Sequence, residues 1–186
     1  MLINILSKMD ISYDKQNEII ILYYEKITEY AGDIKNDKFE GKGILYNKNG
    51  NKLYEGDFKI RIEGKGILYF ENGNKSYEGD FKNDTFEGKG IKYYENGNKR
   101  YEGDFKNGKY EGKGILYNEN ENKFYEGDFK NGEYEGKGIV YYENGNKAFE
   151  GDFKIDKPEG KGIMYDINGN ILYEGDFKNG NMKEKE

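Results

Sequence analysis

The chain is built from one short unit that recurs every 23 or 24 residues. Residues 101–124 read YEGDFKNGKYEGKGILYNENENKF, and residue 125 begins nearly the same sequence again. A Gly-Lys-Gly triplet marks the period, with its first glycine at positions 41, 64, 88, 112, 136 and 160. Six full repeats cover residues 30–172, and a half repeat covers 173–180. This recurrence predicts an array of small stacked units rather than a globule around one central core.

Each unit has the pattern of a β-hairpin. Along Tyr101–Lys106, alternation places Tyr101, Gly103 and Phe105 on one face and the charged residues on the other. Asn107-Gly108 is typical of a tight hairpin turn, because both residues tolerate positive φ. A second strand follows over residues 110–117. We therefore predict an all-β fold in which tandem hairpins form a single elongated, twisted antiparallel sheet.

Composition fits a thin, repetitive sheet of this kind. Only 34% of the 186 residues are hydrophobic, which alone would favour disorder. Yet there are 19 Tyr, 11 Phe and 27 Gly. We expect the repeated aromatic residues to form the core, and the glycines of Gly-Lys-Gly to make room for an aromatic ring from the adjacent strand.

The second strand leaves the assignment of its faces open. Strict alternation groups Gly112 and Gly114 with Leu116, and separates them from Ile115. The column that contains Leu116 also contains Lys92 in another repeat. Since a lysine is tolerated there, we expect this column to be the more exposed one.

The ends of the chain depart from the repeat. Residues 1–29 contain Ile19–Tyr24, which resembles a degenerate second strand, and we expect this segment to cap the array of residues 30–180. Apolar residues at the spacing of a short N-terminal helix are Leu2, Ile5, Leu6 and Met9. Residues 181–186 are predicted to be a charged tail, which would leave the strand at 173–178 as an open edge.

The Tyr-Glu-Gly-Asp-Phe, Asn-Gly and Glu-Gly-Lys-Gly-Ile elements resemble the MORN (membrane occupation and recognition nexus) repeat. The resemblance covers about residues 30–180 and implies tandem β-hairpins. The Tyr-Tyr-Glu-Asn-Gly-Asn-Lys connection also resembles a bacterial MORN-like antitoxin repeat family. The MORN family has been linked to acidic phospholipids, scaffolding and homodimerisation, and fold membership does not choose among these.

Composition also excludes several chemistries. The chain has no Cys and no His, so thiolate ligands and Ser-His or Cys-His catalysis are ruled out. Its carboxylates recur unchanged along the array, whereas a catalytic site is normally singular. Aspartates of neighbouring repeats would lie about 9.6 Å apart, too far to share a cation. We therefore expect no catalytic, metal or cofactor site.

Charge and the N-terminal sequence bear on partners and location. The formal net charge of −6 disfavours nucleic acid and anionic membrane surfaces as partners. The N-terminal residues lack the basic stretch of a signal peptide, so we expect a cytoplasmic protein.

The leading interpretation is a non-enzymatic scaffold that binds another protein or a second copy of itself as a homodimer. Positions where repeats differ are candidate contacts, and apolar residues exposed in a polar array would favour this role. The candidate partner-binding residues are Ile60, Arg61, Ile62, Lys92, Ile155 and Pro158.

Two alternatives remain open. One is a peripheral module that binds acidic phospholipid through a regular lysine column. That column comprises Lys42, Lys65, Lys89, Lys113, Lys137 and Lys161. The other is an antitoxin-like inhibitor of a toxin protein.

Overall fold

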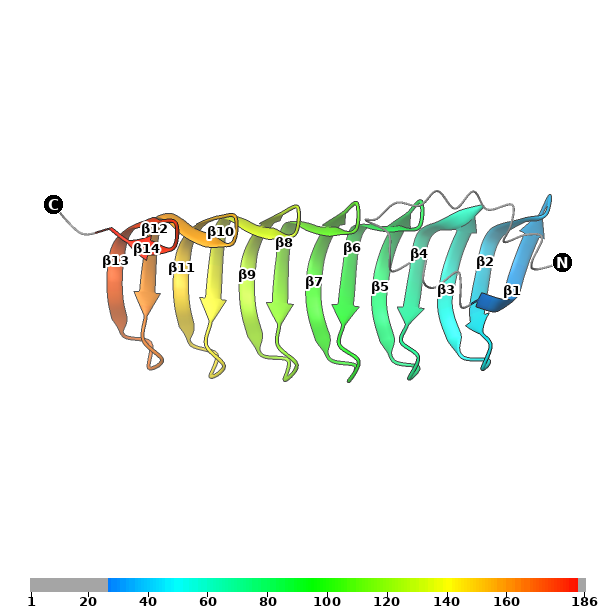
Figure 1. Ribbon diagram of the computed structural model, residues 1–186, viewed down its shortest axis with the longest axis horizontal. Helices are drawn as coiled ribbons and strands as arrows, with labels where there is room; N and C mark the ends of the chain where they lie inside the picture. The colour runs from blue at the N-terminus through cyan, green and yellow to red at the C-terminus, as the bar shows by residue number, and fades with distance from the viewer. Residues whose placement is uncertain (1–26, 184–186) are drawn as a thin grey trace. The chain divides into compact units, whose positions relative to one another are not determined.

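The computed structural model describes residues 27–183 and confirms the predicted all-β class. All fourteen strands of this part belong to one antiparallel sheet, and their order in the sheet follows their order in the sequence (Figure 1). The predicted short N-terminal helix and the degenerate strand at residues 19–24 lie outside the described residues.

The strands fall into two compact units, which meet in sequence between Gly97 and Asn98. In the first unit they are β1 (Ile27–Lys35), β2 (Lys38–Asn47), β3 (Lys52–Lys59), β4 (Arg61–Tyr69), β5 (Lys75–Lys82) and β6 (Thr85–Tyr93). In the second unit they are β7 (Lys99–Lys106), β8 (Lys109–Tyr117), β9 (Lys123–Lys130), β10 (Glu133–Tyr141), β11 (Lys147–Lys154), β12 (Lys157–Tyr165), β13 (Ile171–Lys178) and β14 (Asn181–Met182).

The hairpin turns have the predicted backbone geometry. Asn107 and Gly108 have φ values of 50° and 77°, which match the left-handed conformations that a two-residue hairpin turn requires. Ile155 adopts φ 50° at the corresponding position, although β-branched residues rarely occupy this region. Turn geometry is therefore imposed by the repeat even where the local residue does not favour it.

A row of aromatic rings forms the core on one face of the sheet. Tyr101 and Tyr125 are fully buried, and each stacks on a tyrosine of its own hairpin with ring centroids 3.8 Å apart. Tyr101 also meets Phe129 of the next hairpin edge to face at 5.4 Å. Its hydroxyl donates to the Asp104 carbonyl oxygen at 2.9 Å, so burial leaves no polar atom of the ring unsatisfied.

Glycine is required beneath each ring because the ring lies against the backbone. A Cβ added to Gly138 would lie 2.6 Å from Cε2 and 2.7 Å from Cζ of Tyr125. The prediction that this glycine accommodates an aromatic ring is confirmed. The first glycine of the triplet has a different role: Gly136 has φ 72°, a conformation that other residues rarely adopt.

The predicted exposure of the leucine column is wrong. Leu45 and Leu68 are each only 1% exposed, because they lie on the same face as the rings. In the second unit, Leu116 pairs directly with Tyr125 and is half-buried. Lys92 is accommodated in this column because its ammonium group lies over the Phe86 ring, 5.2 Å from the centroid.

The C-terminal end also differs from the expectation. Asn181 and Met182, assigned to the charged tail, form strand β14 and pair with Lys178 and Phe177. The predicted open edge is therefore covered at the end of β13.

Candidate binding groove

The face opposite the rings carries two regular rows of side chains. Ile115 pairs with Glu102 on one neighbouring strand and with Glu126 on the other, so isoleucine and glutamate alternate from strand to strand. Two residues earlier on β8, Lys113 faces Asp128. Because residues two apart on a strand share a face, the second row runs parallel to the first.

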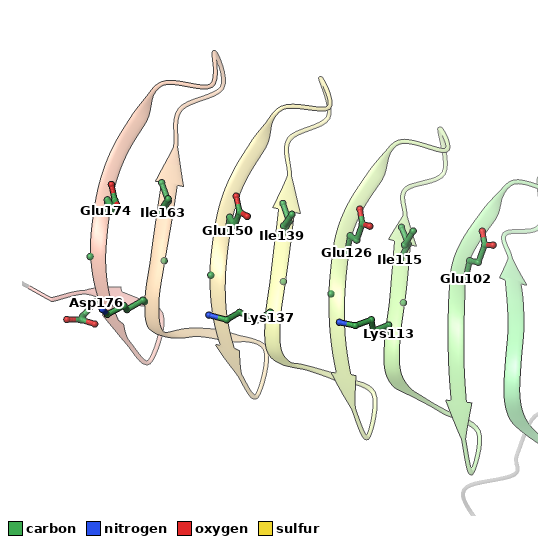
Figure 2. Close-up of a pocket in the computed structure, with 17 residues that line it drawn as sticks. Glu102, Lys113, Ile115, Glu126, Lys137, Ile139, Glu150, Ile163, Glu174 and Asp176 are labelled. Carbon is green, nitrogen blue, oxygen red and sulfur yellow. The ribbon is translucent and has the colours of Figure 1, made fainter.

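These rows border a groove of about 1080 Å³ in the second unit. Figure 2 shows the Glu and Ile side chains at one level of the strands and Lys113 and Lys137 at another. Between the rows lie the glycines, whose backbone forms the floor. The lining residues that the argument below uses are Glu126, Ile115, Ile139, Ile163, Lys113 and Lys137. A shorter groove of about 670 Å³, with the same kinds of residue, occurs in the first unit.

Five groove glutamates are held by the lysine three residues earlier on their own strand, whereas Glu174 has Ile171 at that position. Lys123 Nζ lies 2.7 Å from Glu126 Oε2, and the Tyr141 hydroxyl donates to the same oxygen at 3.3 Å. The hydrogen bond from Lys123 is the largest cause of a lowered pKa for Glu126. The same arrangement lowers the pKa of Glu55 and Glu78. The carboxylates of Glu55, Glu78 and Glu126 are consequently ionised at neutral pH.

Four lysines of the column proposed for lipid binding form ion pairs with aspartate, and Lys161 lies opposite Asp176 in the strand register. The distances are 2.6 Å for Lys42–Asp57, 3.6 Å for Lys65–Asp80, 2.9 Å for Lys113–Asp128 and 2.7 Å for Lys137–Asp152. These lysine side chains are 73–84% exposed, so the pairs contribute little to stability. Acidic neighbours along the whole row do, however, reduce its attraction for an anionic surface.

The candidate partner-contact residues are scattered over the sheet. Ile60 forms the turn between β3 and β4, and is 43% exposed. Ile62 was expected to be exposed, but it is only 1% exposed and pairs with Phe58 in the core. Arg61 forms an ion pair with Asp84 at 3.0 Å.

The remaining candidates lie in the other repeats. Pro158 pairs with Phe153 and is half-buried, whereas Ile155 is 56% exposed at a turn. Lys92 lies on the ring face. The structure therefore does not gather these residues into one site, and their contact roles remain predictions.

Of the two groove rows, the lysine row was identified from sequence as the alternative lipid-binding column, and the row of isoleucines and glutamates was not identified as a site. The recurring carboxylates, such as Glu102, were expected to lie on a charged strand face, and no binding role was assigned to the isoleucine column. The available signal was the cross-strand register, since Glu126 and Ile115 become neighbours only once Gly114 is paired with Gly127.

Among residues 27–183, no cluster of three or more Asp or Glu could hold a metal ion. Over the same range, no helix is long and apolar enough to cross a membrane.

Comparison with known families agrees with the repeat geometry. The MORN repeat pattern matches residues 30–52, 77–99, 101–123, 125–147, 149–171 and 173–183. A MORN repeat variant matches residues 62–83. No curated protein matches the chain.

Proposed function

Because the chain belongs to the MORN repeat family, we propose that it is a non-enzymatic scaffold that binds a partner protein in the groove of its second unit. The observation that carries this proposal is the row formed by Ile115, Ile139 and Ile163 along the groove. Aliphatic side chains that are only half-buried, in a chain that is 35% charged, offer apolar contact area to a partner.

The polar parts of the groove favour a protein over a lipid surface. A membrane would approach the ends of the exposed lysines, where each paired aspartate opposes an anionic headgroup. A polypeptide that enters the groove can instead contact the isoleucines while its polar groups meet both lysine and glutamate. Interfaces of this type combine an apolar centre with a polar rim.

Site-specific photo-cross-linking in native cells tests this proposal. In the test variant, a photoreactive amino acid replaces Ile139, which lines the groove. In the control variant it replaces Ile167, a turn residue that is 56% exposed and does not line the groove. We expect a defined protein adduct from position 139 alone, and loss of that adduct when the neighbouring Ile163 is changed to Lys. An adduct to a second copy of the chain would identify self-association.

Equal adducts from both positions, or an adduct at 139 that survives Ile163→Lys, would contradict groove binding. The fold of each variant is checked by circular dichroism, so that loss of an adduct is not mistaken for unfolding.

A further inference from the structure

The groove has a fixed period along the sheet. Ile115, Ile139 and Ile163 occupy the same position in successive repeats, two strands apart. Since adjacent strands lie about 4.8 Å apart, the isoleucines recur about every 9.6 Å. Any polypeptide lying along the groove can contact all three isoleucines equivalently only if its own period matches.

The polyproline II helix matches this period best. Its three residues per turn and rise of about 3.1 Å give about 9.3 Å per turn, with the same face presented each time. Over two steps, from Ile115 to Ile163, the mismatch is only about 0.6 Å. Seven residues of an α-helix advance about 10.5 Å, so the mismatch with the isoleucine spacing grows to about 1.8 Å over the same two steps. A β-strand reverses its face after three residues.

The width of the groove supports the same conformation. Ile115 and Lys113 are two residues apart on one strand, so their rows are separated by about 6.8 Å at the backbone. This spacing suits a single extended chain, whereas an α-helix with its side chains is about 10–12 Å across. A polyproline II segment has no internal hydrogen bonds, so its carbonyl oxygens need outside donors. One lysine per repeat, such as Lys113 or Lys137, is positioned to supply them.

The charges lining the groove indicate which residues the segment carries. Five carboxylates and three ammonium groups line it. Glu102, Glu126 and Glu150 each form an ion pair with a lysine of their own strand through Oε2, and their side chains stay 41–44% exposed, so a cationic ligand residue can share these carboxylates. The glutamates recur with the isoleucines, so one cationic residue in every three would meet a carboxylate at each turn.

We propose that this groove binds a polyproline II segment in which proline, an apolar residue and arginine or lysine recur with a period of three. This inference rests on the proposed scaffold function and specifies its ligand. The apolar residue packs on the isoleucine row, and the cationic residue pairs with the glutamates.

Fluorescence anisotropy with the full chain tests the proposal. The probe is a labelled peptide of four Pro-Leu-Arg tripeptides, and its control has the same composition in an order without the three-residue period. We expect the periodic peptide to bind at least about tenfold more tightly. Ile139→Lys should weaken its binding by at least about tenfold, and Ile167→Lys should leave it unchanged.

Equal affinity for the two peptides, or no effect of Ile139→Lys, would overturn the proposal. A cross-linked partner that enters the groove as an α-helix would also overturn it, while leaving the scaffold function intact. Absence of any adduct specific to position 139 would instead count against the scaffold function itself.

Discussion

Replacement of Gly138 by alanine tests whether glycine is retained because a ring occupies the Cβ position. The backbone of Gly138 is compatible with alanine, since it does not have a positive φ. If there were room for the added methyl group, alanine would stabilise the folded state by about 0.4–1 kcal/mol, because it reduces the conformational entropy of the unfolded chain. Space is lacking, because the new Cβ would lie 2.6 Å from Cε2 of the fully buried Tyr125.

The magnitude follows from the contacts of Tyr125. Overpacking of a tight core costs about 1–3 kcal/mol. Displacing the ring would also weaken the 3.0 Å hydrogen bond from its hydroxyl to the Asp128 carbonyl oxygen, at a cost of about 1 kcal/mol. After subtraction of the alanine gain, we expect Gly138→Ala to lower the free energy of unfolding by about 2 kcal/mol.

Urea unfolding of a double-mutant cycle provides the assay. In a Tyr125→Leu background, Gly138→Ala should cost less than about 0.5 kcal/mol, because the ring is gone. Gly145→Ala is the matched control, since Gly145 has φ 85° and no heavy atom within 4 Å of the added Cβ. Its cost of about 1 kcal/mol should be the same in both backgrounds. If Gly138→Ala were neutral in the wild-type background, or equally costly in both, the reasoning would be refuted.

Three further outcomes can be checked by unfolding measurements. Burial raises the pKa of Tyr101 and Tyr125 above 10.0, so their contribution to stability is complete below pH 10 and is lost as the pH rises. Alkaline titration should show the last of the 19 tyrosines ionising together with unfolding, and ionisation of all of them while the fold stays intact would contradict this. Ile155→Asn should raise the free energy of unfolding by about 1 kcal/mol, because asparagine tolerates φ 50° better, and an unchanged urea midpoint would argue against strain at this turn. Asp84→Ala should lower the free energy of unfolding by about 1–3 kcal/mol, because the buried Ile62 N–H loses its acceptor at 2.8 Å. Thermal unfolding should show a clearly smaller loss for the control Asp156→Ala, because the hydrogen bond that Asp156 accepts from the Tyr134 N–H is exposed.

The parts of the fold that depend on neighbours in sequence could be predicted. Alternation assigned Tyr101 and Phe105 to the buried face, and Asn107-Gly108 gave the turn. The glycine beneath each ring followed from the occurrence of glycine inside a strand. Repetition strengthened these inferences, since the same geometry must hold in every copy.

The errors arose where one residue was interpreted without its spatial neighbours. Lys92 suggested an exposed column, but a cation can lie over an aromatic ring on a buried face. Ile62 was expected to be exposed together with Ile60 and Arg61, where the repeats differ. Its pairing with Phe58 shows that it occupies the position held by Tyr110 opposite Phe105. Pro158 takes the same position opposite Phe153.

The groove could not be recognised from sequence for a related reason. Its rows combine residues that are 11 or 13 positions apart, such as Ile115 with Glu126 and Glu102. The register that joins them includes an irregularity between Gly103 and Asp104, where β8 contributes extra residues. Repeat counting alone does not reveal this irregularity.

The ring contacts have a consequence for how the length of such a chain can change. Tyr101 and Tyr125 each contact an aromatic residue of their own hairpin and one of the next. Excision of residues 125–148 would place Phe149 directly after Phe124, where it would pair with Leu116 as Tyr125 does now. The hairpin that ends at Phe124 and the hairpin that begins at Phe149 would each pack against a repeat of the same kind as its present neighbour. A gene encoding this chain could therefore gain or lose whole units by recombination in frame, and each unit gained would lengthen the array by one hairpin.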